Sequence, residues 1–456
     1  MGIYTAMSTA VGGLNAQAYA LEQISGNIAN SQTTAFKRTD VSFQDLVTPS
    51  AANRQDAATV QVNSRPTNTI QGDVTGNSVP TYMAISGDGY FVVGNKSGEV
   101  DGKAVFDSID LYTRRGDFER DAEGYLVNGS GYYLKGLELD PNTGNAVGSA
   151  PSLVKVTNDL LPAKATTDVD YRANLPSYPQ TRNADTTVSG SELLNPVLFA
   201  NDPTVAGDGF VQAQDETVFY DSTVSGGAVT AYMPTGASAN IQMRWGKIDN
   251  TSGSETWNLF YLEDSTATGT SAMWRNVGTD FVFNAAGSLT SPTATSITIP
   301  NLTVENQNLG AIGINFGTDG ITQFDDVGGA VQVTELRQNG YPAGEFSSIN
   351  ISDDGRIVVN YGNGQNIEVA QVALATFSAD NKLEKRDGGV FAATSDSGVA
   401  ILGATGGVVG SALEASNTEI ADEFTKLIVT QQAYSANSRI ITTADEMINE
   451  VLNIVR

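Results

Sequence analysis

Carboxylates are the main candidates for chemistry in this sequence. Its 456 residues include 51 Asp and Glu but neither Cys nor His. Thiolate nucleophiles, disulfides and thiolate metal sites are therefore excluded, and so are imidazole bases, imidazole metal ligands and Ser-His-Asp triads. What remains is carboxylate chemistry, such as the hydrolysis of a glycoside between two acids or the binding of calcium.

The Asp-rich turns could supply oxygen ligands to a cation. They are Asp353-Asp354-Gly355, Asp325-Asp326 and the segment from Asp140 to Gly144. None has the alternating acidic spacing and the distal Glu of an EF-hand loop, and Asp or Asn in a turn usually bonds to its own backbone. No glycine-rich phosphate loop is present either. We therefore expect no catalytic residue, no cofactor and no bound metal, although 51 acidic residues leave a glycosidase pair open.

The balance of charge disfavours two classes of partner. With 25 Lys and Arg against 51 acidic residues, the formal net charge is -26. Such a surface repels the phosphates of nucleic acid and the anionic surface of a membrane. No run reaches the ~18–20 apolar residues of a membrane span, and the N-terminus lacks the basic start and long apolar run of a secretory signal. We expect no nucleic-acid partner, no membrane insertion and no cleaved signal peptide.

The N-terminal segment has the spacing of a helix that packs against another helix. From Ile3 to Ile28, apolar residues recur at intervals of seven, which is a heptad pattern. One row contains Met7, Leu14, Leu21 and Ile28, and its companion contains Tyr4, Val11, Ala18 and the polar Ser25. The adjacent Gly12 and Gly13 each cost about 1 kcal/mol relative to Ala in a helix. This helix is therefore not expected to persist alone.

The C-terminal segment repeats the pattern over a greater length. Its apolar row, at intervals of seven, is Leu413, Ile420, Leu427, Tyr434, Ile441, Ile448 and Val455. The partner row has a polar middle and reads Asn417, Phe424, Gln431, Ser438, Asp445 and Leu452. A helix over residues 416–456 would be roughly 60 Å long at ~1.5 Å per residue. Ser416 or Asn417 could be its N-cap, with Glu419 completing a capping box.

Two long helices at the chain ends, with nothing comparable between them, suit a pairing of the two ends. We expect them to form a coiled coil that is completed only when further copies of the chain supply the missing contacts. The alternative, that both are ordinary core helices of a globular domain, stays open at this point.

The chain between the helices is predicted to be β structure. Ile349 and Ile351, the turn at 353–355, and then Ile357 and Val359 alternate with a period of two, as in a hairpin. Long helical periods are absent from this part of the sequence. The fold class is therefore mainly β with long terminal α-helices.

Shifts in composition predict a nested domain organisation. All three Trp residues fall within 157–330, which we interpret as an outer β domain inserted in one segment. The remaining ranges pair the two ends of the chain: 1–31 with 416–456 as a helical polymerisation core, 32–72 with 399–415 as extended connectors, and 73–156 with 331–398 as an inner β domain. The glycines between 399 and 411 resemble a flexible joint.

The residues after the first helix resemble the signature of the flagellar rod and hook axial proteins. Residues 27–38 read Asn-Ile-Ala-Asn-Ser-Gln-Thr-Thr-Ala-Phe-Lys-Arg, close to the family's N-[IL]-A-N-x-x-T-x-G-[FY]-K. Ala35 stands where that family usually has Gly, and Ala tolerates a left-handed backbone poorly. Residues 85–93, 112–118 and 413–419 are similar to further blocks of the family, in the same order along the chain.

The resemblance implies a structural subunit rather than an enzyme. Distal rod proteins lack a large inserted domain, so the length of this chain favours the hook type of subunit, with the distal rod type as the alternative. Such subunits assemble with copies of themselves into a flexible tube that transmits torque, and they meet rod, hook-cap and hook–filament junction proteins. They are exported by the flagellar type III apparatus, without signal cleavage, to the outside of the cell. A monomeric carbohydrate-active or adhesive β protein is the remaining alternative.

An assembly interface is expected along the two helices and the signature segment. It comprises Met7, Val11, Leu14, Leu21, Ile28, Asn30, Thr33, Phe36, Lys37, Leu413, Asn417, Ile420, Phe424, Leu427, Gln431, Tyr434, Ile441, Ile448 and Leu452. The polar residues Gln431, Ser438 and Asp445 would either face a central channel or pair with neighbouring helices.

Overall fold

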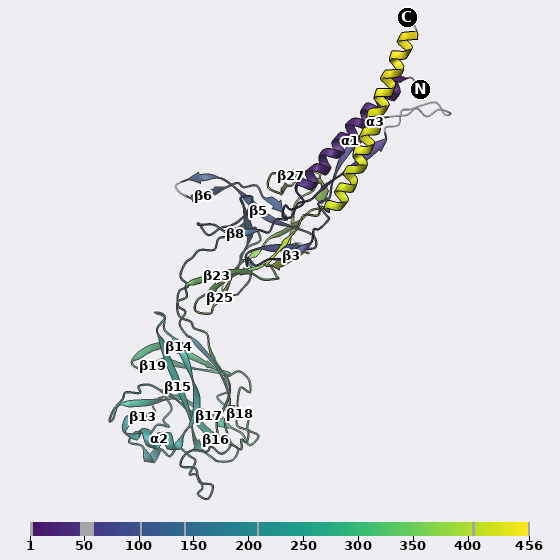
Figure 1. Cartoon of the computed structure of the whole chain (residues 1–456). Coiled ribbons are helices and arrows are strands. Elements are labelled where there is room, and N and C mark those ends of the chain that lie inside the picture. The colour runs from purple at the N-terminus through teal and green to yellow at the C-terminus, as the bar shows by residue number, and fades with distance from the viewer. Residues whose placement is uncertain are drawn as a thin grey trace. The chain divides into compact units, whose positions relative to one another are not determined.

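A computed structural model describes residues 3–45, 59–100, 103–140, 143–207, 209–403 and 406–454. It has a helix at each end, α1 (Ile3–Ala29) and α3 (Ile420–Ile454), with mostly strands between them (Figure 1). The prediction of a mainly β protein with terminal helices is confirmed. Val455 and residues 141–142 of one Asp-rich turn lie outside the described residues. No helix within these ranges is long and apolar enough to cross a bilayer.

The chain divides into two compact units. Unit 1 contains Met1–Asn158, Ser347–Asn360 and Asn366–Arg456, and unit 2 contains Asp159–Phe346 and Tyr361–Gln365. Unit 1 is therefore built from the two ends of the chain, and nearly all of unit 2 comes from the segment between them.

Unit 2 contains two sheets. The first has the order β19-β20-β12-β21, with β22 paired to β12, and the second has the order β13-β17-β16-β15-β14, with β18 paired to β17. The strands and the short helix of this unit are β12 (Asp168–Asn174), β13 (Phe210–Gln212), α2 (Glu216–Ser222), β14 (Val224–Tyr232), β15 (Ser238–Asp249), β16 (Glu255–Leu262), β17 (Ala272–Phe283), β18 (Leu289–Ser291), β19 (Ser296–Val304), β20 (Gln307–Asn315), β21 (Ile321–Thr322) and β22 (Gln332–Gln338).

The core of unit 2 mixes aliphatic and aromatic side chains. Trp245 and Trp257 are fully buried among the side chains that the two sheets direct inward. The Nε1 of Trp245 donates to the hydroxyl of Tyr171 at 2.8 Å, and that hydroxyl donates to the carbonyl of Gly226 at 2.9 Å. The indole of Trp245 and the hydroxyl of Tyr171 therefore have partners, whereas the buried Nε1 of Trp257 has none among the described residues.

Unit 1 is organised around one large sheet with the main order β23-β24-β25-β10-β5-β7-β28-β27. Strands from both sides of the inserted segment pair within it: Gly136 lies opposite Val372, and Phe91 lies opposite Leu374. Its strands are β5 (Tyr90–Val100), β6 (Lys103–Phe106), β7 (Leu111–Thr113), β8 (Phe118–Arg120), β9 (Leu126–Asn128), β10 (Tyr132–Glu138), β11 (Ser152–Leu153), β23 (Phe346–Ile351), β24 (Arg356–Tyr361), β25 (Asn366–Val372), β26 (Leu374–Thr376), β27 (Glu384–Arg386), β28 (Val390–Ala392) and β29 (Ile401–Leu402).

The hairpin predicted around residues 353–355 is confirmed. It joins β23 to β24, which are neighbours in the sheet. Gly355 has a φ of +77°, which the turn requires and which Gly adopts without a steric cost. Ile357 and Val359 point into the core with no exposed surface, as their alternation predicts.

The segments expected as extended connectors are paired strands. Residues 32–72 contain an antiparallel ribbon of β1 (Thr39–Asp45) and β2 (Val60–Pro66). In 399–415, β30 (Gly407–Gly410) pairs with β4 (Met83–Ser86), and β31 (Ala412–Glu414) pairs with β3 (Val74–Gly76). The Gly-rich stretch is therefore not a free joint in its described part, because β29, β30 and β31 each pair with another strand.

Candidate functional site

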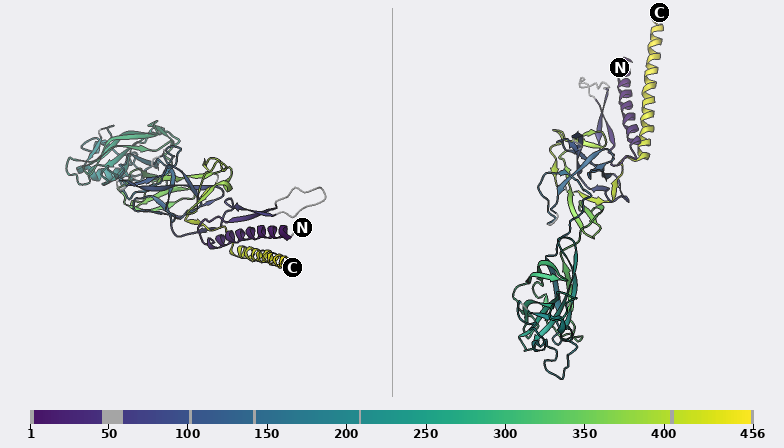
Figure 2. Two further views of the ribbon diagram at one scale, coloured as in Figure 1. Left: turned by 90° about the horizontal axis from the view of Figure 1, so that it is seen from above. Right: turned by 90° about the vertical axis from the view of Figure 1, so that its left-hand side faces the viewer.

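The two terminal helices lie side by side and antiparallel, and both chain ends are found at the same end of the pair (Figures 1 and 2). The buried line on α1 is formed by small residues and one Ile: Ala10, Gly13, Ala16, Ala20 and Ile24. The large residues of the predicted row, Met7, Leu14, Leu21 and Ile28, are only half-buried, and Val11 is exposed. Small side chains therefore fill the seam that we expected large ones to fill. A coiled-coil geometry of the pair stays a prediction.

The apolar row of α3 and its partner row contain both half-buried and exposed residues. Leu427, Ile441 and Ile448 are half-buried. Ile420, Phe424, Tyr434 and Leu452 are 41%, 50%, 41% and 61% exposed, and Gln431 is exposed as well.

Further apolar side chains of α3 are exposed that the heptad rows did not include. They are Ile428, Val429, Ile440, Met447 and Val451, each between 46% and 60% exposed. The heptad rows miss them because, at ~100° per residue, Val429, Ile440, Met447 and Val451 lie on a different side of α3 from Tyr434 and Leu452. In the described chain, α3 therefore carries much more uncovered apolar surface than a helix of a closed core does.

A buried charge cluster holds the base of the helices to the sheet of unit 1. The Nζ of Lys37 lies 2.5 Å from Oε1 of Glu414, and NH1 of Arg114 lies 3.3 Å from Oε2 of the same carboxylate. All three side chains are 4% exposed or less. Lys37 also donates to the carbonyl of Ile70 at 2.7 Å, and Arg114 donates to that of Gly87.

Burial lowers the pKa of Lys37, and the neighbouring Glu414 carboxylate opposes that shift. An ammonium without water around it needs such a partner to remain charged. Glu414 serves two cations at once, so it is the residue on which the cluster depends. Lys37 was predicted as an interface residue, but its side chain is inside the subunit.

Ser416 or Asn417 was predicted as the N-cap of the last helix, and both expectations are wrong because α3 begins at Ile420. The Oδ1 of Asn417 accepts from the backbone N of Arg38 at 2.8 Å, while its Nδ2 donates to Thr67 and to the carbonyl of Ile70. The side chain of Asn417 is used to connect three distant segments, so it is not available to cap a helix.

Asn27 performs a similar task where α1 ends. Its amide exchanges two hydrogen bonds of 3.0 Å with the backbone of Thr39 in β1, and it donates to Oε2 of Glu423 in α3 at 3.0 Å. Glu423 is fully buried and accepts a further bond from Lys426. Although partial burial opposes it, the bonds to Glu423 and Asp40 raise the pKa of Lys426. One side chain thus joins both helices and the ribbon.

The other predicted residues of the signature segment are local. Thr33 Oγ1 donates to Asn30 Oδ1 at 3.1 Å, and Asn30 Nδ2 donates to the carbonyl of Gly26 at 2.9 Å. The ring of Phe36 lies under the ammonium of Lys385, 4.1 Å from Nζ to the ring centroid. These contacts shape the turn that follows α1.

Leu413 lies apart from the other members of its predicted helical row. It is in β31, opposite Thr75 of β3. The structure therefore brings Asn27, Lys37 and Asn417 into one polar junction, and it leaves Ile420, Phe424 and Tyr434 on an open apolar surface. Arg114, Glu414 and Glu423 also belong to the junction and were not predicted as site residues. Glu414 and Arg114 are charged residues within the segments that resemble the family, so they could have been chosen as candidates. Their contact with each other could not be predicted, because it joins segments that are far apart in the sequence.

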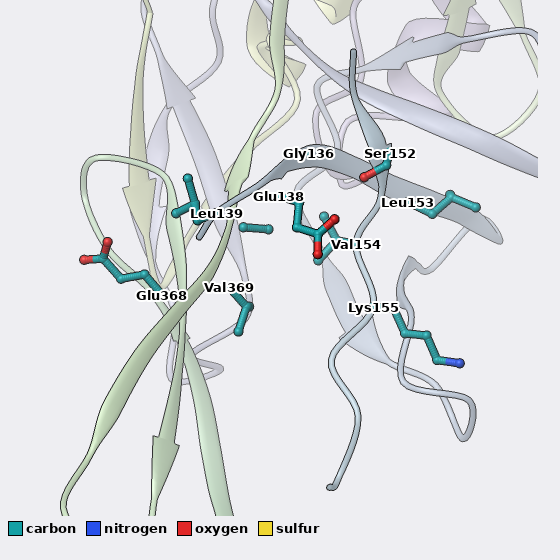
Figure 3. Close-up of a pocket in the computed structure, with 10 residues that line it drawn as sticks. Gly136, Glu138, Leu139, Ser152, Leu153, Val154, Lys155, Glu368 and Val369 are labelled. Carbon is teal, nitrogen blue, oxygen red and sulfur yellow. The ribbon is translucent and has the colours of Figure 1, made fainter. Parts of the chain in front are cut away.

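A surface hollow of about 400 Å³ lies beside β10 in unit 1 (Figure 3). Glu138 and Glu368 line it, but their carboxylates point in different directions, and Glu368 is bound to Arg356. Lys155 points away from both (Figure 3). The lining side chains therefore do not converge on one point as the two acids of a glycosidase do. No group of three metal-binding side chains occurs in the part of the chain that the structure describes.

Known families match both ends and both units of the chain. Residues 7–37 match the flagella basal body rod protein family, and 84–167 match the D1 domain of the flagellar hook protein FlgE/F/G. Residues 204–341 match the D2 domain of the flagellar basal body protein FlaE, and 409–454 match the C-terminal region of the flagellar basal body rod FlgEFG proteins.

Individual relatives match over their full length. The flagellar hook protein FlgE of Escherichia coli (strain K12) is 30% identical over 98% of this chain and 100% of its own. That of Brucella suis biovar 1 is 28% identical over 100% of both chains. The crystal structure of Helicobacter pylori flagellar hook protein FlgE2 covers 75% of this chain with a TM-score of 0.50 and 17% identity, which supports the fold alone.

Proposed function

This chain belongs to the flagellar hook protein family, and we propose on that premise that it is the structural subunit of a bacterial flagellar hook. The observation that carries the proposal is the match to a hook protein over 98% of this chain and all of that relative, so that unit 2 is included. A distal rod subunit is not favoured, because the match includes the inserted segment. The hook would be a flexible tube that transmits torque from the rod to the filament.

The open apolar surface of α3 supports assembly with further copies of the chain. Ile420, Phe424, Ile428 and Tyr434 are each more than 40% exposed, on a helix that packs beside α1. Burying one large aliphatic or aromatic side chain contributes about 1.5–3 kcal/mol. Several such residues in each copy can offset the repulsion between chains of net charge -26.

The sites of contact with neighbouring copies follow from this surface. We assign the exposed members of the predicted interface, including Val11 and Leu452, to contacts between copies. The half-buried members, such as Leu14 and Leu427, contribute to the helix pair and keep an edge for a neighbour. Export by the flagellar type III apparatus, and contacts with rod, cap and hook–filament junction proteins, belong to the same proposal and rest on family membership.

The role of the exposed polar residues Gln431, Ser438 and Asp445 is a further part of the proposal. A central channel through which unfolded chains pass has to remain free of large apolar patches, since these would retain the passing chain. Polar residues on one side of α3 would meet that requirement.

The experiment is electron microscopy of the purified chain under conditions that promote polymerisation. We expect curved tubes from the natural sequence and none from the double variant Phe424→Asp, Ile428→Asp. Its matched control is Val327→Asp, a fully exposed apolar residue in a loop of unit 2, which should form tubes normally. Straight rods from the natural sequence would favour a rod subunit. Tubes from the double variant would show that this surface of α3 is not part of the interface.

A further inference from the structure

Nothing within α1 itself explains why two adjacent glycines, Gly12 and Gly13, lie in the middle of this helix. Gly is a poorer helix former than Ala, and two in succession weaken the helix at one point. The surroundings of each glycine explain its presence. A Cβ atom added at Gly12 would lie 2.0 Å from Oγ1 of Thr59 and 3.3 Å from its Cβ. A Cβ atom added at Gly13 would lie 2.9 Å from Nδ2 of Asn437.

The two contacts belong to different elements. Thr59 directly precedes β2 and therefore belongs to the β1–β2 ribbon, whereas Asn437 is in α3. Consecutive residues of an α-helix point about 100° apart around its axis, since 3.6 residues complete one turn. Two adjacent glycines therefore open two neighbouring sides of the same turn of α1. One side admits the ribbon, and the other admits α3.

We propose that Gly12 and Gly13 are separate positioning residues, of which Gly12 seats the β1–β2 ribbon on α1 and Gly13 seats α3. The polymer-forming end of the subunit is then a unit of three elements rather than a pair of helices. This inference deepens the proposed function. It rests on that function only for the measurement of tube formation, and the hydrogen-exchange measurement does not depend on it.

The other end of α1 shows the same division of contacts. Asn27 bonds to Thr39 of the ribbon and to Glu423 of α3, so it also connects α1 to both neighbours. Gly12 and Asn27 are 15 positions apart, which corresponds to roughly 22 Å along a helix. The three elements are thus held at two levels, by hydrogen bonds at the base and by close approach farther along. Between these levels they border a hollow of about 370 Å³, lined by Ala20 and Ile24 among others.

Three alanine substitutions within α1 test the proposal in the full-length chain. Gly26→Ala is the matched control, because a Cβ atom at Gly26 would have no neighbour within 4 Å. All three variants gain helix propensity by the same chemical change. Native-state amide hydrogen exchange is measured on the unpolymerised protein, and tube formation is measured by electron microscopy.

We expect Gly12→Ala to accelerate exchange in β1 and β2 at least 10-fold while leaving α3 within twofold of the natural chain. Gly13→Ala should accelerate exchange in α3 instead, by a smaller factor, because the end of the Asn437 side chain can move aside. Gly26→Ala should leave both elements unchanged and should form tubes normally.

Second-site substitutions show whether each glycine has its own partner. Added to Gly12→Ala, the substitution Thr59→Ala should restore the exchange protection of the ribbon, but added to Gly13→Ala it should not restore that of α3. Asn437→Ala should restore the protection of α3 in Gly13→Ala and should not restore that of the ribbon in Gly12→Ala. Equal effects of all three glycine substitutions, or rescue without this pairing, would overturn the proposal. If the natural chain forms no tubes, the proposed hook function fails, while the exchange data still decide the assignment of the glycines.

Discussion

The side chains of Lys37 and Glu414 meet at 2.5 Å although the two residues are 377 positions apart in the chain. Water is excluded from the pair, since the side chains are 1% and 0% exposed. Arg114 adds a second buried cation on the same carboxylate. A buried ion cluster is stabilising only while every charge has its partner. The segment that carries Glu414 therefore determines whether the N-terminal signature residues can be buried at all.

Substituting Glu414 with Gln tests this dependence. The variant leaves Lys37 and Arg114 buried without a carboxylate, and removing one partner of a buried pair costs about 3–5 kcal/mol. We expect that loss in the free energy of unfolding of unit 1, measured by chemical denaturation. Hydrogen exchange should also accelerate in β3 and β31, which lie beside the cluster.

A surface pair of the same unit provides the control. Glu384 is bound to Arg386, and both side chains are more than half exposed. Glu384→Gln should therefore change the free energy of unfolding by about 0.5 kcal/mol or less. Equal losses for the two variants would show that burial of the Glu414 cluster contributes no extra stability.

The amide of Asn27 gives a second prediction. Asn27→Ala removes the bonds to the backbone of Thr39 and leaves Glu423 with one partner fewer. Each buried polar group left without a partner costs about 1–3 kcal/mol. We expect α1 and the ribbon to lose hydrogen-exchange protection together. Asn449→Ala, which removes an exposed amide of α3, should leave protection unchanged.

Periodicity predicted the elements of this protein because the side chains obey local rules. The alternation of Ile357 and Val359 places both on the buried face of β24, and the turn at Gly355 is local as well. The heptad rows likewise predicted a helix at each end. These features require only the spacing of residues that are neighbours in the sequence.

The interior of the helix pair could not be predicted in the same way. The heptad rule selects large residues such as Leu14, whereas the structure buries Ala16 and Ala20 and leaves Leu14 half-buried. Which side of α1 is covered depends on where α3 and the β1–β2 ribbon lie. The spacing of apolar residues along α1 does not predict the position of either. The pairing of Lys37 with Glu414 is also invisible to spacing, because it joins opposite ends of the chain.

Ala35 leads to a third prediction. The family that this chain resembles usually has Gly at this position, and Ala tolerates the left-handed backbone poorly. The φ of Ala35 is +54°, so the left-handed backbone is present although the residue is not Gly. Its N–H donates to the carbonyl of Glu414 at 2.8 Å, which holds it in that conformation. A left-handed conformation costs a non-glycine residue about 1–2 kcal/mol, and more when the side chain is β-branched.

Two substitutions at this position separate strain from packing. Ala35→Val should lower the free energy of unfolding by about 1–3 kcal/mol. Ala35→Gly removes the strain but also a buried methyl group and some rigidity of the unfolded chain, so it should remain within about 1 kcal/mol of the natural protein. Thermal unfolding measures both. A Val variant as stable as the Gly variant would contradict the left-handed backbone.

The tyrosines of unit 2 predict how the protein responds to alkali. Burial raises the pKa of Tyr261 to about 12, and burial also raises that of Tyr171. An unfolded chain ionises its tyrosines near pH 10. Above that pH the folded state therefore retains protons that the unfolded state has released, so stability is full below pH 10 and decreases as the pH rises toward 12.

For Tyr261 alone, a difference of about two pH units corresponds to a loss of about 2–3 kcal/mol. Denaturation can be followed by tryptophan fluorescence, which reports on unit 2 because Trp245, Trp257 and Trp274 all lie in it. Tyr261→Phe should flatten the decrease in unfolding free energy between pH 10 and 12, because Phe has no proton to lose. Tyr4→Phe, a change at an exposed residue of unit 1, should leave the decrease as it is. An unchanged slope in Tyr261→Phe would mean that this hydroxyl ionises in the folded protein as readily as in water.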